Sequence, residues 1–281
     1  MFFAATDAAA RPLNEQELVV VAGLLVASLL VYFRFFRRLG TNGPQTRPDL
    51  LGFPEMIAGI VVMLLFAGVV ANKFLGPAAP PPTISTDILL HSMAAAALPA
   101  VTILILIIAR GGHVTSIFGL NKVGIFKALG LGFCLAILAL PLTYAAKALT
   151  MSLTDTEEAP QVLVQKFQSA VDGGDLALMG LIALSACIVA PITEELIFRG
   201  AFYPMLSRGL GRVVAAVVGA LFFAFVHDTY TDVPGLTVLA LCFTLAYEVT
   251  GSLLVPIFMH MVFNSISLLV LWWQIREGLT P

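Results

Sequence analysis

The sequence predicts an all-α fold, a multi-pass transmembrane helical bundle of about eight spans. Of its 281 residues, 59% are hydrophobic and only 11% are charged, whereas a typical soluble domain carries about 25% charged residues. Apolar runs of about 20 residues, the length that crosses a bilayer core as a helix, recur along the chain. A net charge of −2 gives no basic surface for nucleic acid, which is therefore not an expected partner. The expected partner is the lipid bilayer, because the apolar runs have the length of membrane spans.

Eight apolar runs are the expected spans. The fifth run has two alternative ends, at Leu196 or at Met205. No basic segment precedes the first run, so we expect a span there and not a signal peptide. In chain order the spans are Leu18–Phe33, Phe53–Val70, Thr86–Ala109, Ile125–Ala146, Leu176–Leu196, Val213–His227, Val233–Val249 and Leu253–Trp272.

Lysines and arginines are distributed unevenly between the segments that join the spans. Ten of the fifteen fall on one side, in the first loop, the third loop and the segment after the fifth span. Because basic residues accumulate on the cytoplasmic side, this count predicts a cell-membrane protein with both termini outside and the turn Ser207–Arg212 in the cytoplasm. On the outer side, Gln161–Val171 is either an amphipathic helix at the interface or an ordinary loop helix.

Ionisable side chains occur within the later spans, where a charge is costly and marks a candidate site. Helical spacing gives three pairs of residues on shared helix faces, because the members of each pair are four residues apart. The pairs are Glu195 with Arg199, Phe223 with His227, and His260 with Asn264; Glu194 precedes the first pair on a different face.

These polar groups are expected at similar depths in the membrane. Counted from the cytoplasmic turns at ~1.5 Å per residue, Glu194 lies about 16 Å deep, His227 about 21 Å, His260 about 12 Å and Asn264 about 18 Å. Three helices that bring polar groups to one depth predict a polar cavity within the bundle, open to the cytoplasm. Glu248, at the end of the seventh span, is instead expected at the interface.

The chemistry of these side chains favours hydrolysis of a peptide bond. A carboxylate and an imidazole that share a water, here Glu194 and His227, can remove its proton. A second imidazole with an amide N–H, here His260 and Asn264, can stabilise an oxyanion. The sequence contains neither His-Glu-x-x-His nor Gly-x-Ser-x-Gly, so the common zinc-protease helix and the serine nucleophile elbow are not expected.

Each group also has another interpretation. The Glu195–Arg199 pair alone is typical of a structural ion pair, His227 of an interfacial residue, and the pair in the eighth span of an interhelical hydrogen bond. Glu194, His227 and His260 supply the ligand types of an open zinc site. Zinc is therefore the alternative to a reaction without a cofactor.

The ordered motifs resemble those of a known family, the type II CAAX prenyl endopeptidases, also called the CPBP or Abi family of membrane proteases. The resemblance covers roughly Leu176–Leu269. The matching motifs are Glu194-Glu195-x-x-x-Arg199, Phe223-x-x-x-His227 and His260-x-x-x-Asn264.

The resemblance implies a role for each motif residue in a glutamate-type mechanism without a metal. Glu194 would activate water with help from His227, and His260 and Asn264 would stabilise the oxyanion. Glu195 and Arg199 would support the first motif, and Phe223 would pack beside the site. The implied substrate is a hydrophobic or lipidated peptide or a membrane protein. The alternative is a non-catalytic protein on the same scaffold that binds a hydrophobic peptide or confers immunity.

The chain is accordingly expected to divide into five parts. The C-terminal four-span region is the expected catalytic core, because all three motifs fall within it. The parts are an N-terminal tail (1–17), an N-terminal four-span region (18–150), a polar loop with the candidate interfacial helix (151–175), the catalytic core (176–272) and a C-terminal tail (273–281).

Overall fold

The computed structural model describes residues 14–279 except residue 44 and the segments 76–85, 155–161 and 228–229. Within these ranges the chain forms helices and turns and no strand. The all-α fold predicted from composition is therefore confirmed. The α-helices are α1 (Glu15–Thr41), α2 (Phe53–Leu75), α3 (Thr86–Ala109), α4 (Val114–Ile117), α5 (Ile125–Thr154), α6 (Val162–Asp172), α7 (Leu176–Leu184), α8 (Ala190–Glu195), α9 (Tyr203–Leu210), α10 (Arg212–Phe225), α11 (Val233–Thr250) and α12 (Leu254–Arg276).

Each expected span corresponds to a helical segment, but their lengths differ from those predicted. Seven helices of the described chain are long and apolar enough to cross a membrane. The exception is α10, which has 14 residues and is therefore about 21 Å long. It ends at Phe225, so His227 lies in the turn beyond the helix and not on its last turn, as the sequence had suggested.

The first helix begins and ends outside its apolar run. Asn14 and Glu17 form a capping box, in which each side chain accepts a hydrogen bond from the other residue's backbone N–H. Helix α1 then continues to Thr41, eight residues beyond the expected end at Phe33. Arg34, Arg37 and Arg38 were predicted to lie in the first loop, and they are instead part of α1.

The fifth span is one uninterrupted helical segment from Leu176 to Leu210, which confirms the longer of its two predicted ends. Asp175 caps its start by accepting from the N–H of Leu178. Two π-helical segments, η2 (Ser185–Val189) and η3 (Leu196–Phe202), lie on either side of α8. Such π-helical turns occur frequently at functional sites, and α8 carries both glutamates of the first motif.

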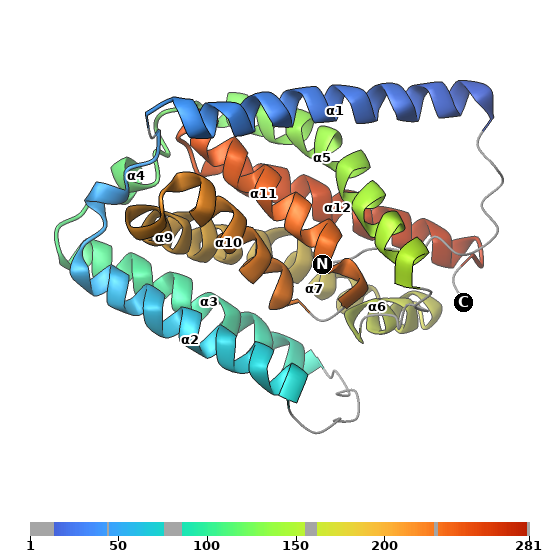
Figure 1. Ribbon diagram of the computed structural model, residues 1–281. Helices are drawn as coiled ribbons and strands as arrows, with labels where there is room; N and C mark the ends of the chain where they lie inside the picture. Colours follow the sequence, from blue (N-terminus) through green and yellow to red (C-terminus); the bar gives the residue numbers. More distant parts are fainter. Residues whose placement is uncertain (1–13, 44, 76–85, 155–161, 228–229, 280–281) are drawn as a thin grey trace.

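The C-terminal helices α11 and α12 form the centre of the bundle. About 61% and 56% of their apolar windows are buried, against 11% for α1. Figure 1 shows α1 along one side of the bundle next to α5, and the α2–α3 hairpin on the opposite side. Of the motif residues, His260 and Asn264 lie on one of these two enclosed helices.

Close backbone approach fixes α12 against its neighbours. A Cβ added to Gly132 of α5 would lie 2.8 Å from the Cβ of Phe258 on α12, so a larger residue does not fit there. The turn into α12 passes through Gly251, whose φ of 64° is left-handed and favours glycine. These contacts set the position of α12 and of the two motif residues on it.

The segment before the fifth span contains the short helix α6. Its buried side chains, among them Phe167 and Ala170, pack with Leu178 of α7 and Leu271 of α12 in one apolar cluster. The predicted helix within Gln161–Val171 is therefore present, with residue 161 outside the described part. Its position relative to a membrane interface stays a prediction.

Candidate active site

A buried ionic network joins α8, η3 and α12. Arg199 Nη1 donates to Glu195 Oε1 over 2.9 Å, and the Nδ1–H of His260 donates to the same oxygen over 3.0 Å. Arg199 Nη2 donates to the carbonyl oxygen of Ala240 on α11 over 2.8 Å. All three charged or titratable side chains are at most 2% exposed. A buried carboxylate requires such partners, so Glu195 compensates Arg199 and orients the imidazole.

Glu194 faces two imidazole rings. Its Oε2 lies 3.9 Å from Nε2 of His227 and 3.9 Å from Nε2 of His260. Both separations are too long for direct hydrogen bonds, and each is within the span that a bridging water covers. The Glu194 side chain is 28% exposed, while its Oε2 atom is buried and has no hydrogen-bond partner.

The orientation of both rings follows from their other nitrogen. The Nδ1–H of His227 donates to the carbonyl oxygen of Phe223 over 2.6 Å, as that of His260 donates to Glu195. A neutral imidazole with Nδ1–H presents a lone pair at Nε2. Both Nε2 atoms are therefore directed toward the Glu194 carboxylate.

Phenylalanine rings enclose the cationic and imidazole groups. The Phe223 ring centre lies 4.6 Å from that of His227, and the Phe243 ring centre lies 4.9 Å from that of His260. Arg199 Cζ lies 4.7 Å from the centre of Phe223 and 5.2 Å from the centre of Phe243. These cation–π contacts further compensate the buried guanidinium. Phe223 thus packs against His227 and Arg199, and Phe243, which the sequence did not single out, packs against His260.

Asn264 forms a hydrogen bond to another helical segment, as one of its two interpretations predicted. Its Nδ2 donates to the carbonyl oxygen of Ala186 in η2 over 2.8 Å. The Oδ1 atom is buried and has no hydrogen-bond partner in the described chain. Asn264 therefore connects α12 to the π-helical segment preceding α8, and one of its two amide hydrogens is committed to this contact.

A cavity of about 310 Å³ opens beside Glu194 and His227. We expected its lining to come from the last four spans, and this expectation was too narrow. Phe66 of α2 and Ala95 and Pro99 of α3 line it as well. The first spans carry no recognisable motif, so sequence reasoning had no signal for this wall.

Helix α3 contains a proline beside the cavity. Pro99 has no N–H, so the carbonyl of Ala95, four residues earlier, lacks its usual helical donor. Both residues line the cavity.

Glu248 lies in a second buried polar cluster, and its position relative to a membrane interface stays a prediction. Its Oε1 accepts hydrogen bonds from Tyr203 Oη and from Thr46 Oγ1, each at a distance of 2.8 Å. Arg212 Nη1 donates to Oε2 over 3.2 Å. The carboxylate is 4% exposed and joins α9, α10 and α11 to the segment after α1.

The described residues contain no group of three His, Cys, Asp or Glu side chains arranged to hold a metal ion. The three cysteines are unpaired, in agreement with their single occurrence in apolar runs. The titratable groups nearest one another at the candidate site are one carboxylate and two imidazoles, surrounded by an ion pair and phenylalanine rings.

Comparison with known proteins gives matches to only part of the chain, and the family match covers the candidate site. Residues 177–266 match the family model "Type II CAAX prenyl endopeptidase Rce1-like". This interval contains every residue of the three motifs, so the resemblance is confirmed where it was observed. No solved structure was found to match the chain.

Two curated proteins align with part of the chain. One is the "Membrane-embedded CAAX protease MroQ" of Staphylococcus aureus (strain USA300), 32% identical over 83 residues, which cover 27% of this chain and 34% of that protein. The other is the "Putative membrane peptidase YdiL" of Bacillus subtilis (strain 168), 27% identical over 99 residues, covering 35% and 41%. The alignments thus span about a third to two fifths of these relatives.

Proposed function

We propose that this protein is an intramembrane endopeptidase that hydrolyses a peptide bond with a water activated by Glu194 and His227. The observation that most supports this proposal is the position of Glu194 Oε2, which lies 3.9 Å from Nε2 of His227 and 3.9 Å from Nε2 of His260. A water can bridge groups at such a separation. The family match over 177–266 and the names of both relatives support a membrane peptidase.

The proposed reaction begins with proton transfer from water to Glu194. The water lies between Glu194 Oε2 and His227 Nε2, and its oxygen attacks the carbonyl carbon of the scissile peptide as Glu194 takes one proton. A tetrahedral intermediate forms with negative charge on the former carbonyl oxygen. Glu194 then returns the proton to the leaving nitrogen as the C–N bond breaks, which yields a carboxylate and a free amine.

His260 and Asn264 are the proposed stabilisers of the oxyanion. Glu195 holds the His260 ring through Nδ1, and Nε2 would donate to the oxyanion when the ring carries a proton on both nitrogens. Asn264 retains one amide hydrogen besides the one that it donates to Ala186. Removing a single such donor typically lowers kcat by about 10²–10³-fold.

The proposed substrate is a hydrophobic or lipidated peptide or a segment of a membrane protein. The cavity wall supports this class, because Phe66, Ala95, Ile197 and Phe198 present apolar surface next to Glu194. We further propose a cell-membrane location with both termini outside and the cavity open to the cytoplasm, on the distribution of lysine and arginine.

Proteomic comparison of membranes that contain wild-type or Glu194→Gln protein tests the proposal and identifies the substrate. The substitution keeps the side-chain shape and removes the base, so cleavage of any substrate is expected to fall by about 10²–10⁴-fold. Glu277→Gln, at the exposed end of α12, is the matched control and should leave cleavage unchanged. Cleavage products that persist with Glu194→Gln would overturn the proposal. A physiological effect retained without cleavage would favour the non-catalytic binding protein.

The proposed mechanism uses no metal, and this is tested separately. Activity of purified protein is expected to survive strong chelators, and metal analysis should find no stoichiometric zinc. Zinc that is present in wild-type protein and lost in His260→Ala would instead assign the cluster of Glu194, His227 and His260 to a metal.

A further inference from the structure

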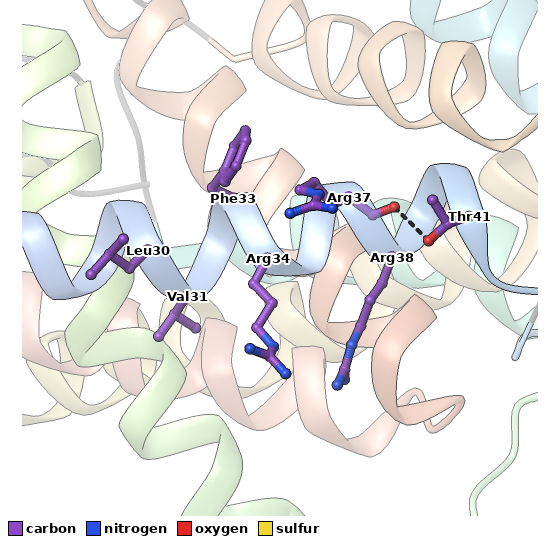
Figure 2. Close-up of a pocket in the computed structure, with 7 residues that line it drawn as sticks. All are labelled: Leu30, Val31, Phe33, Arg34, Arg37, Arg38 and Thr41. Carbon is purple, nitrogen blue, oxygen red and sulfur yellow. Dashed lines mark hydrogen bonds between the residues drawn. The ribbon is translucent and has the colours of Figure 1, made fainter.

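The C-terminal part of α1 carries three arginines in an unusual setting. Arg34, Arg37 and Arg38 lie within one surface pocket of about 580 Å³, together with Leu30 and Phe33. Figure 2 shows the Arg34 and Arg38 side chains extending from one side of α1, while Arg37 and Phe33 lie on the other side of the ribbon.

None of these three side chains forms a hydrogen bond or ion pair within the described residues. Other arginines of the described chain do have protein partners. Arg47 bonds Asp49, Arg110 bonds Glu55, Arg199 bonds Glu195, Arg208 bonds the carbonyl of Leu51, and Arg212 bonds Glu248. The positive charge of α1 is thus left uncompensated by the part of the protein that the structure describes.

The end of α1 does not account for these arginines. The carbonyls of Arg37 and Arg38 have other donors, since Thr41 Oγ1 donates to the first and the Asn42 N–H to the second. The guanidinium groups are exposed, and five N–H donors on each remain suited to a planar or tetrahedral anion.

The arginines directly follow the apolar run of α1, where a membrane-spanning helix approaches the headgroup region. They begin directly after the apolar run Leu18–Phe33, whose 16 residues extend about 24 Å as a helix. Leu30 and Phe33, in the same pocket, are 66% and 63% exposed. An apolar surface thus adjoins a cationic one at the boundary between the acyl chains and the headgroups.

We propose that Arg34, Arg37 and Arg38 bind the phosphate of an anionic phospholipid whose acyl chain lies along Leu30 and Phe33. Charge complementarity argues for this occupant, since the three cations meet a phosphate in the bilayer, and the adjoining apolar side chains require a chain that inorganic phosphate lacks. Basic pockets beside transmembrane helices recognise lipid headgroups on this principle.

The test is lipid retention by the purified full-length protein, read by native mass spectrometry. Phosphatidylglycerol and phosphatidylcholine with identical acyl chains are added in equal amount. Wild-type protein is expected to retain phosphatidylglycerol preferentially. Each arginine near the surface contributes about fivefold, so Arg38→Gln should lower the preference about fivefold and Arg34→Gln/Arg38→Gln about 25-fold.

Arg47→Gln is the matched control. It removes the same charge from the segment between α1 and α2, but Arg47 is already engaged, and its hydrogen bonding holds the pKa of the Asp49 carboxyl below the usual value. The preference should change less than twofold. An equal loss in Arg47→Gln, or full preference in the double variant, would overturn the proposal.

Competition distinguishes a lipid site from a simple anion site. Short-chain phosphatidylglycerol is expected to displace the bound lipid, and inorganic phosphate at the same concentration is not. Equal displacement by both would contradict the lipid assignment. The measurement does not involve peptide cleavage, so its outcome is independent of the peptidase proposal.

Discussion

Two regions of the molecule differ in whether their arginines are buried and paired within the protein. Beside the candidate active site, Arg199 is 2% exposed and is surrounded by Glu195, a backbone carbonyl and phenylalanine rings. On α1, Arg34, Arg37 and Arg38 are exposed and lack such partners in the described chain. The comparison separates charges that the protein itself compensates from charges left to the surroundings.

The difference has an energetic consequence. A buried charge that loses its partner costs several kcal/mol, because water cannot replace the partner. An exposed charge keeps its solvent or lipid contacts whether or not it is substituted. The substitutions below therefore range from large losses of stability near α8 to almost none on α1.

The largest effect is expected for Arg199→Met. Removing the guanidinium leaves Glu195 buried with only His260 as a partner, so the protein should lose about 3–5 kcal/mol of stability. Unfolding in detergent measures the loss. Arg276→Met, which removes an arginine lying over the Trp272 ring at the end of α12, is the control and should cost far less. Equal losses of stability in the two variants would contradict the distinction between buried and exposed arginines.

Lys147→Met tests whether the same rule holds at a second buried pair. Lys147 Nζ lies 3.0 Å from Asp232 Oδ1, and the two side chains are 6% and 0% exposed. The single substitution should cost about 3 kcal/mol, whereas Lys147→Met/Asp232→Leu should recover most of this loss, since an apolar pair needs no compensation. A double variant less stable than the single one would contradict this account.

Tyr203→Phe is expected to have an intermediate effect. It removes one of three donors to the buried Glu248, and a hydrogen bond to a charged group contributes about 1.5–3 kcal/mol. In a Glu248→Gln background the same change should cost less, because the charge is absent. A double-mutant cycle measures the difference, and an unchanged cost would show that the hydroxyl acts elsewhere.

The smallest effect is expected for Arg37→Gln. An exposed residue without protein partners should change stability by no more than about 0.5 kcal/mol. Unfolding in lipid-free detergent is the measurement, since bound lipid would add its own contribution. A loss above 1 kcal/mol would mean that α1 arginines are compensated by the protein after all.

Much of the fold follows from the sequence because a bilayer demands long apolar helices. The order of the spans, the continuous fifth span and the contact of Phe223 with His227 all follow from apolar length and four-residue spacing. The early end of α10 did not, because the apolar run continues through Val226 while the helix ends one residue before it.

Contacts between distant segments were the part of the site that spacing could not predict. The bond from His260 to Glu195 joins residues 65 positions apart, and that from Asn264 to Ala186 joins residues 78 apart. Glu248 was predicted at the interface because it lies near a helix end, and its partners Thr46, Tyr203 and Arg212 come from three other segments. Local periodicity carries no information on such pairings.

A bilayer crossed by α10 would have to adapt to the shortness of this helix. A helix of about 21 Å is roughly 9 Å shorter than a hydrocarbon core of about 30 Å. Neighbouring acyl chains must tilt or compress to cover it, which draws headgroups and solvent inward around the turn that bears His227. The membrane would thus be thinnest beside the proposed nucleophilic water, and bilayers of short-chain lipid would suit this protein better than thick, sterol-rich ones.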